Sequence, residues 1–315
     1  MGVQEVRITG LGAYLPEVMH SNETLPPLDP PMPVRDMDRI GVLRRGWASD
    51  SEGVAAMAVE AAHRALAQAE VEPASLDFVI LANWTERRYV PDFAPVVQHA
   101  LGASRAFSYD VCCACSGFVY GLAMAHGFLQ NPRFSRGLVV ASDVSSRMLR
   151  PGSRGTLVFG DGAGSAVVER GGARGGRLID YELRTDGSHN AIMDVGPDGY
   201  LRSHIAQREL NALAGRSIGA VSRALLERNQ LSLDDVTWIV PHSGTAGVQA
   251  MVAEDLGVSR DKILTNLPIV GNVTTASIPV AVCHFVAEGK IRPGDLILSA
   301  SVGLGWQYVA VLYTL

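Results

Sequence analysis

The sequence predicts an α/β protein of five layers, α/β/α/β/α, built from two similar halves. Three observations lead to this prediction. Short strands rich in Val, Ile and Leu alternate with helices, similar phrases recur at corresponding places in two halves, and apolar residues are plentiful. Of the 315 residues, 47% are hydrophobic and 19% are charged, which is enough apolar material for a large core. Helices that alternate with short apolar strands are typical of sheets covered on both faces.

The repeat begins with a helix that leads into a strand. In the first half, a helical stretch over 54–69 leads to SLDFVILAN over 75–83. In the second half, a helical stretch over 218–229 leads to SLDDVTWIVPH over 232–242. Each SLD run opens a short strand rich in β-branched residues.

Each strand is followed by a helix that ends in nearly the same phrase. This phrase is LGASR at 101–105 and LGVSR at 256–260. A second strand and a tight turn come next, in DVCCACSG over 110–117 and in IVGNVTTAS over 269–277. Agreement of this length at matching places indicates a duplication.

Each half closes with an apolar strand, a Gly-rich turn and a last strand. The apolar strands are GLVVASD at 137–143 and GDLILSAS at 294–301, and the closing segments are GDGAGSAVV at 160–168 and GLGWQYVAVLY at 303–313. We therefore divide the chain into an N-terminal half, 1–170, and a C-terminal half, 171–315.

Composition and charge exclude several classes of function. The net charge of −5 argues against a broad nucleic-acid surface, although a local cluster of arginines forms either a basic patch or a solvated loop. The arginines of this cluster are Arg35, Arg39, Arg44 and Arg45. No uncharged apolar run reaches the roughly 18 residues that span a membrane, and the first residues lack a signal-peptide pattern. We expect a soluble, cytoplasmic protein.

The cysteines form neither a metal site nor a disulfide framework. Cys112, Cys113 and Cys115 lie within four residues, too close for the usual zinc spacings, and Cys283 is far away in the sequence. No metal site is predicted. The cluster is either core filling or a reactive thiol.

Cys115 begins the run CSGFVYGLAMAHGFL, which is apolar on nearly every face and predicts a buried helix. A thiol at a helix N-terminus meets the positive end of the helix dipole, which favours the thiolate. The alternative is that Cys115 is a small buried hydrophobic residue. The following Ser116 and Gly117 permit a sharp turn from strand to helix, which favours a functional thiol.

Two polar residues in the second half are further candidates. His242 follows the strand VTWIV and lies at its carboxyl end, where sites in α/β sheets usually occur. Asn272 follows Gly271 in the turn that corresponds to the cysteine turn. Each has a purely structural alternative, a buried histidine or an ordinary helix cap. The duplication predicts that Cys115 and Asn272 face each other across a pseudo-twofold axis.

Together these residues suit thioester chemistry. Cys115 can form an acyl-enzyme, and His242 and Asn272 can donate hydrogen bonds to a thioester carbonyl as it becomes an enolate. The turn over 303–305 can supply a backbone N–H to an oxyanion at Cys115. GDGAGS runs into a strand instead of a helix and is not a dinucleotide motif, so we interpret its glycines as turns packed near the site.

The sequence resembles the ketosynthase III group of the thiolase fold over essentially its whole length. The motifs are ACSGF at Cys115, VPH at His242, GNVTTASIP at Asn272 and GDGAGSAVV at 160–168. The resemblance implies that these three residues form the catalytic triad and that the N–H groups of Cys115 and Gly305 form the oxyanion hole.

The resemblance also implies the substrates and partners. It implies an acyl group carried as a thioester of coenzyme A or of the phosphopantetheine of an acyl carrier protein, and no permanently bound cofactor. It implies a homodimer in which the region of PDF, at 91–93, reaches the acyl pocket of the partner. Arg39 and Arg154 match family arginines at the cofactor entrance.

The chain departs from the family pattern at the entrance to the site. After the histidine the family reads HQANxR, whereas this chain reads HSGTAG, so that Thr245 and Gly247 replace the family asparagine and arginine. Arg35 replaces the tryptophan that stacks on adenine. The segment TERRYV at 85–90 places unusual charge beside the acyl pocket. These departures indicate a specialised member that serves polyketide or other secondary metabolism.

The leading hypothesis is a decarboxylating condensation of an acyl group on Cys115 with a malonyl-type thioester. The alternative is an acyltransferase that passes the acyl group to a hydroxyl or amine without condensation. A non-catalytic subunit of a heterodimer is a third possibility, which the intact set of Cys115, His242 and Asn272 argues against.

Overall fold

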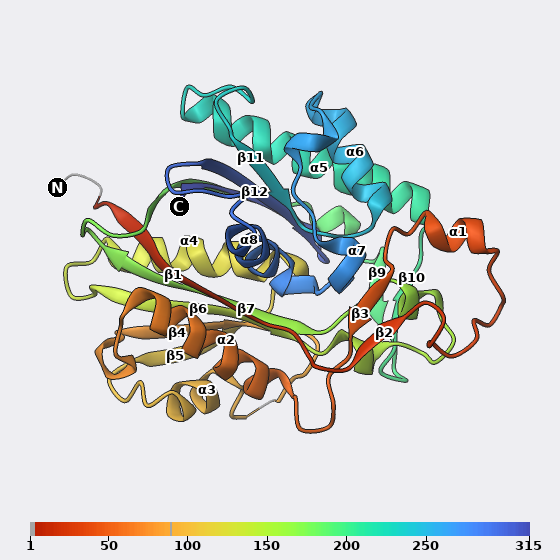
Figure 1. Cartoon of the computed structure of the whole chain (residues 1–315), viewed down its shortest axis with the longest axis horizontal. Coiled ribbons are helices and arrows are strands. Elements are labelled where there is room, and N and C mark those ends of the chain that lie inside the picture. Colours follow the sequence, from red (N-terminus) through yellow and green to blue (C-terminus); the bar gives the residue numbers. More distant parts are fainter. Residues whose placement is uncertain (1–3, 89) are drawn as a thin grey trace.

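The computed structural model of the chain describes residues 4–88 and 90–315, apart from the side chains of Val34 and Arg35. The elements stack in five layers, in which two helices lie between two groups of strands and two further helices cover each outer face (Figure 1). The predicted α/β/α/β/α order is therefore confirmed. The outer helices on one side are α2 (Val54–Ala69) and α3 (Ala94–Ala100), the central helices are α4 (Gly117–Leu129) and α8 (Ser277–Ala287), and the outer helices on the other side are α5 (Gln207–Arg228) and α6 (Ala246–Leu256).

The strands of both halves belong to one sheet of nine, in the order β11-β12-β13-β8-β1-β7-β6-β4-β5. The halves join edge to edge where Val6 to Ile8 of β1 pair antiparallel with β8. The sheet therefore folds back on itself around α4 and α8. The strands are β1 (Val6–Tyr14), β4 (Phe78–Ala82), β5 (Phe107–Val111), β6 (Arg136–Asp143), β7 (Gly162–Arg170), β8 (Gly176–Thr185), β11 (Trp238–Pro241), β12 (Leu296–Gly303) and β13 (Gln307–Thr314).

The two halves share a strand topology. The parallel pair β4 and β6 is followed by antiparallel β7 and β1, and the parallel pair β11 and β12 is followed by antiparallel β13 and β8. A single parallel bridge between Ile239 and Ile263 takes the place of the β4–β5 pairing. The connection from β7 to β8 covers 171–175, which supports our proposal that the halves divide after residue 170.

The helix α2 has the bounds that the sequence predicts. Its buried positions, which are mostly alanines, follow the helical spacing from Val54 to Ala69 and form one face against the sheet. Small side chains let β1 approach closely, because a Cβ atom added at Gly12 would lie 2.1 Å from the carbonyl oxygen of Ala61. The glycines of the N-terminal GLGAY are thus packing positions beneath a helix.

The helix α5 is longer than predicted and begins at Gln207, whereas the apolar pattern indicated a start at Ile218. The Glu209 side chain accepts a hydrogen bond from the N–H of Ala206 and stabilises the first turn. Its first residues, Gln207 to Glu209, are polar and exposed, and the next apolar side chains, Leu210 and Leu213, are half-buried against the core. The apolar pattern is therefore sparse in the first two turns.

Three apolar clusters separate the layers. The largest surrounds the two central helices, and the others lie beneath the outer helices on each side. Short elements complete the described chain: β2 (Met19–Ser21) pairs with β3 (Arg44–Gly46), β9 (Met193–Val195) pairs with β10 (Leu201–Ser203), and α1 (Val34–Asp38) and α7 (Leu267–Val270) lie in connections. Within the described residues, no helix combines the length and apolar character needed to cross a membrane.

Candidate active site

Two equivalent turns precede the central helices. A 3₁₀ turn over Ala114–Ser116 leads into α4, and a 3₁₀ turn over Thr274–Ala276 leads into α8. Both begin with a left-handed residue, at φ 43° in Ala114 and φ 46° in Thr274. This conformation is costly for an L-residue, so its presence in both turns marks a shared geometry.

The match between the turns corrects one expectation from the sequence. Counting from the left-handed residue, Cys115 corresponds to Thr275, and Asn272 corresponds to Cys112. The turns are counterparts as predicted, but Cys115 and Asn272 do not hold equivalent positions. The phrase similarity alone could not reveal this offset, because CCACS and NVTTA share no residue at matching positions.

Backbone and hydroxyl contacts bring the cysteine turn to the end of β12. Ser301 donates from its hydroxyl to the carbonyl oxygen of Cys115 at 2.8 Å. One residue earlier on β12, the carbonyl of Ala300 accepts the N–H of His242 at 2.8 Å. Cys115 and His242 thus attach to adjacent residues of the same strand.

Asn272 is held with a defined amide orientation. Its backbone N–H donates to Val158 at 2.8 Å and its carbonyl accepts the N–H of Gly160 at 3.0 Å, so the glycine-rich GDG segment supports the turn as expected. Its side-chain oxygen accepts the N–H of Thr274 at 2.9 Å. The amide NH₂ group therefore remains as the donor that this 5% exposed side chain can offer.

His242 is a buried, neutral imidazole. It is only 4% exposed, and burial lowers its pKa to about 4, against the opposing effect of a backbone hydrogen bond with Thr274. In the described part of the chain, its Nδ1 atom has no hydrogen-bond partner. Near neutral pH this side chain carries one N–H donor, and Nδ1 has no carboxylate beside it to strengthen it as a base.

Cys115 differs from the expected thiolate. Burial, together with the nearby Asp143 carboxylate, raises the pKa of the Cys115 thiol well above its usual value. The helix α4 begins two residues later, at Gly117, and desolvation of the sulfur outweighs the favourable polarity of its own backbone N–H. This shift favours the protonated thiol of the half-buried Cys115. Its neighbour Cys112 is exposed, and burial raises the pKa of Cys113 to about 11.

Gly305 lies in the turn between β12 and β13, at a φ of +124° that L side chains rarely adopt. The same turn packs tightly against the cysteine turn, because a Cβ atom at Gly303 would lie 2.4 Å from the carbonyl oxygen of Cys113. The proposed oxyanion donor thus belongs to a segment that touches the nucleophile's turn.

Of the three arginines expected at the entrance, two have described side chains, and both of these are exposed. Arg39 follows α1, and its side chain is 79% exposed and paired with Asp36 at 3.2 Å. The segment beside it packs on the start of α6, where the N–H of Ala246 donates to Ile40 at 3.0 Å. Arg154 is exposed on a separate loop, and the side chain of Arg35 lies outside the described residues.

Arg45 does not belong to the surface cluster of arginines. It is fully buried, and its guanidinium donates to Asn22 and to the carbonyl of Leu157, each at 2.7 Å. Burial lowers its pKa to about 10. Its role is structural.

The unusual HSGTAG run is explained by the start of α6. Thr245 is the N-cap, and its hydroxyl accepts the N–H of Val248 at 3.3 Å. A Cβ atom at Gly247 would lie 2.1 Å from Nδ2 of Asn211 on α5. Asn211 therefore occupies the space that an arginine side chain would need at position 247.

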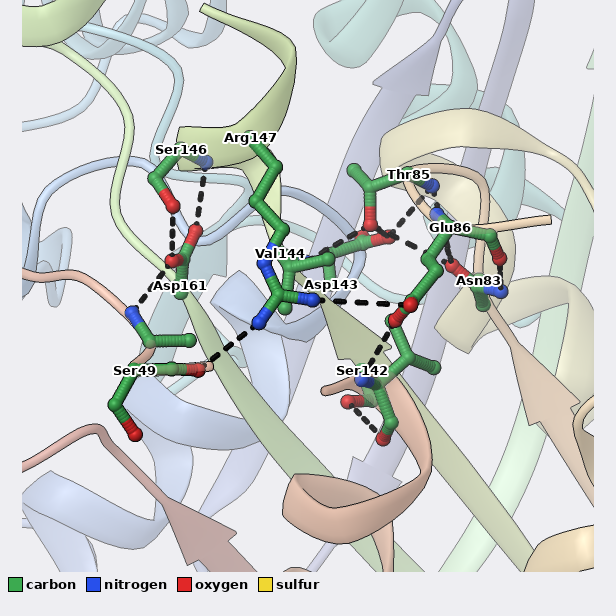
Figure 2. A network of polar contacts seen from close by, with 12 residues as sticks. Ser49, Asn83, Thr85, Glu86, Ser142, Asp143, Val144, Ser146, Arg147 and Asp161 are labelled. Atoms are coloured by element: carbon green, nitrogen blue, oxygen red, sulfur yellow. Dashed lines mark hydrogen bonds and ion pairs between the residues drawn. The ribbon is translucent and has the colours of Figure 1, made fainter. Parts of the chain in front are cut away.

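Glu86 and Arg87 of the TERRYV segment form ion pairs within the protein, and the Arg88 guanidinium lies over the Phe93 ring, 4.6 Å from its centroid. The Glu86 carboxylate accepts the N–H of Val54 at 3.1 Å and pairs with Arg147 at 3.7 Å (Figure 2). Arg87 pairs with Asp92 at 2.7 Å, and Tyr89 lies outside the described residues. These contacts hold the loop in place.

Sequence reasoning missed two buried carboxylates beside the site, Asp143 and Asp161. Asp161 of the GDG segment accepts hydrogen bonds from the N–H of Ala48 and from the N–H and hydroxyl of Ser146, and burial raises its pKa to about 6 (Figure 2). Asp143 ends an otherwise apolar strand. A carboxylate at the end of an apolar strand was the signal in the sequence that could have revealed Asp143, because a buried charge requires several hydrogen-bond donors.

Known proteins resemble this chain over nearly its whole length. Sequence models described as 3-oxoacyl-[acyl-carrier-protein (ACP)] synthase III and as its C-terminal part match residues 109–187 and 226–315. A β-ketoacyl-[acyl-carrier-protein] synthase III from Hyphomonas neptunium is 33% identical, with 98% of each chain covered.

Solved structures agree with this result. The 3-oxoacyl-[acyl-carrier-protein] synthase III from Aquifex aeolicus VF5 matches with a TM-score of 0.91 and 32% identity, over 98% of this chain and 100% of that one. The priming β-ketosynthase from the R1128 polyketide biosynthetic pathway matches with a TM-score of 0.90 and 25% identity, over 99% and 96% of the chains. The chain therefore belongs to the ketosynthase III family of the thiolase superfamily, and it is a condensing enzyme of the acyltransferase type.

Proposed function

We propose that the protein loads an acyl group from a thioester onto Cys115 and condenses it, with loss of CO₂, with a malonyl-type thioester. The observation that carries this proposal is a pair of N–H donors, in His242 and Asn272, on segments that are tied to β12 or to the cysteine turn. His242 is neutral and its Nδ1 has no partner among the described residues, and the amide oxygen of Asn272 is already bonded to Thr274. Two N–H donors suit a developing enolate, whereas transfer to a hydroxyl needs a base strengthened by a carboxylate.

In the first step, the sulfur of Cys115 attacks the donor thioester carbonyl. A tetrahedral oxyanion forms, and the N–H groups of Cys115 and Gly305 stabilise it. The intermediate collapses by breaking the bond to the donor sulfur, which leaves as a thiol with the proton of Cys115.

The duplication supports the role of the Cys115 N–H. In the equivalent turn, the N–H of Thr275 donates to a carboxylate oxygen of Asp143 at 3.1 Å. The same backbone geometry thus binds an anion in the second copy.

In the second step, the bond between the malonyl carboxylate and its α-carbon breaks, and CO₂ leaves. The electron pair passes to the thioester as an enolate, whose oxygen accepts hydrogen bonds from His242 and Asn272. The enolate carbon then attacks the acyl group on Cys115, and the thiolate of Cys115 leaves and takes a proton from solvent.

The thioester carriers are coenzyme A or the phosphopantetheine of an acyl carrier protein, and we place Arg39, Arg154 and Arg35 at the entrance. No permanently bound cofactor takes part.

The protein acts as a homodimer, with the region around 91–93 reaching the partner. In support, β5 is the last strand of the sheet, with an unpaired edge in the described chain. The similarity to the priming ketosynthase supports a place in polyketide or other secondary metabolism.

The test compares the two half-reactions in Asn272→Asp. A carboxylate at position 272 repels the enolate, so we expect CO₂ release from malonyl thioesters to fall by about 100-fold or more, while acylation of Cys115 falls only slightly. Acylation is followed by intact-protein mass spectrometry and CO₂ release with ¹⁴C-labelled malonyl donors. Acyl transfer to a hydroxyl or amine with no CO₂ release from any malonyl donor would overturn the proposal.

A further inference from the structure

Asp143 is a fully buried carboxylate at the end of β6. One oxygen accepts the hydroxyl and the N–H of Thr85 at 2.9 and 3.3 Å (Figure 2). The same oxygen accepts the N–H of Trp84 at 3.2 Å. The other oxygen accepts the N–H of Thr275 at 3.1 Å and the hydroxyls of Thr274 and Thr275. The contacts supply six donors to one carboxyl group.

These contacts join both halves of the chain at the active site. Trp84 and Thr85 follow β4 of the first half, whereas Thr274 and Thr275 belong to the turn before α8. The N–H of Thr274 also orients the amide of Asn272. The hydroxyl of Thr275 also lies 3.3 Å from the carbonyl oxygen of Ala114, the residue before Cys115.

We propose that Asp143 is a positioning residue for condensation, which sets the amide of Asn272 relative to the turn of Cys115. This inference rests on the proposed function for its kinetic consequence. Without the carboxylate, the hydroxyls of Thr274 and Thr275 lose their acceptor and the turn before α8 is free to shift. The donors to the enolate then no longer meet the acyl group on Cys115, and small displacements of this kind reduce rates strongly.

The charge of Asp143 provides a readout that a general structural defect does not give. After the larger effect of burial, the Asp143 carboxylate raises the pKa of the Cys115 thiol, and burial raises the pKa of Asp143 itself. Cys112 and Cys113 are the other titratable groups of the same turn, and His242 follows β11, whose neighbour β12 contacts that turn. A neutral residue at position 143 therefore makes Cys115 easier to ionise while it slows condensation. A partly unfolded protein would not show this combination of opposite effects.

Asp161 offers a matched control. It is equally buried, and Asp161→Asn likewise replaces a hydrogen-bonded interior carboxylate by an amide. Its side chain contacts Ala48 and Ser146, which belong to neither of the two turns (Figure 2).

The experiment measures three properties of wild type, Asp143→Asn and Asp161→Asn. These are the pH profile of Cys115 alkylation by iodoacetamide, the rate of CO₂ release from a malonyl thioester, and the urea unfolding midpoint. For Asp143→Asn we expect the alkylation midpoint to fall by about one pH unit and CO₂ release to fall by at least about tenfold per folded molecule. For Asp161→Asn we expect an unchanged alkylation profile and a loss of activity no greater than the loss of folded protein.

Several outcomes would overturn the proposal. An Asp143→Asn enzyme that keeps half of its CO₂ release would overturn it. Equal losses of Cys115 alkylation and of CO₂ release in Asp143→Asn would also overturn it. If wild type releases no CO₂, the proposed function fails separately, and an unshifted alkylation profile in Asp143→Asn then refutes the placement of Asp143. If Asp143→Asn does not fold, Thr275→Val should lose about tenfold in CO₂ release and Thr275→Ser about twofold, and equal losses in these two variants would contradict the inference.

Discussion

The reactive residues derive their properties more from burial than from charge partners. Burial disfavours the charged forms of both Cys115 and His242, which favours a protonated thiol in one and a neutral imidazole in the other. The polar groups nearby are mostly backbone N–H and hydroxyl donors that are fixed in place. Such donors stabilise negative charge that appears only during reaction.

We predict that acylation occurs on Cys115 and on no other cysteine. We propose an oxyanion site at Cys115 and none at Cys112 or Cys113, although Cys112 is the more exposed thiol. Peptide mapping after incubation with acyl-CoA donors should place the added mass on Cys115, and Cys115→Ala should abolish labelling. Cys113→Ala is the control and should retain labelling. Acyl mass that persists in Cys115→Ala would refute the assignment.

Among the helices and strands, the sequence predicts the bounds best where buried side chains recur at a regular spacing. The bounds of α2 follow from its alanine-rich buried face, and each SLD run does precede a strand. The start of α5 was missed because its first residues are polar and exposed, and Leu210 and Leu213 give too sparse an apolar pattern. The equivalence of Cys115 and Thr275 in the two turns depends on backbone torsions, and the contacts of Asp143 depend on segments far apart in the chain. Neither feature therefore has a local sequence pattern.

The entrance elements also lead to a prediction about the donor. Because Asn211 fills the space beside Gly247, the usual family arginine has no replacement at that position. We propose that the exposed Arg39, which follows α1, and the exposed Arg154, in the loop after β6, hold the phosphates of the donor instead. Arg39→Glu and Arg154→Glu should each raise the KM for the thioester donor by about tenfold or more, with kcat nearly unchanged, since charge-assisted contacts contribute about 1.5–3 kcal/mol. Initial-rate kinetics with a CoA donor measure this.

Arg133→Glu is a suitable control for charge reversal, because this exposed residue lies in the loop between α4 and β6. Unchanged donor kinetics in both entrance variants would show that the donor enters elsewhere.

For the whole molecule, the buried imidazole makes stability depend on pH. The pKa of His242 falls from an ordinary 6.5 to about 4 on folding, so the unfolded chain binds a proton that the folded chain rejects between these values. Stability is therefore present above about pH 6.5 and is lost as pH falls towards 4. The full contribution is about 3 kcal/mol.

We expect His242→Gln to flatten this part of the stability curve, as measured by urea unfolding between pH 4 and 7. The exposed His63→Gln on α2 should leave the slope as in wild type. Asp161, whose pKa rises to about 6, acts in the opposite direction in both proteins and cancels in the comparison. Identical slopes for wild type and His242→Gln would contradict the prediction.

The two matching turns also bear on stoichiometry. A duplicated fold offers two places where a backbone N–H can bind an acyl oxygen, one at Cys115 and one at Thr275. The second place is permanently filled, because Asp143 accepts the N–H and the hydroxyl of Thr275. Under the proposed function, each chain therefore binds a single acyl group, even though its architecture repeats the same turn.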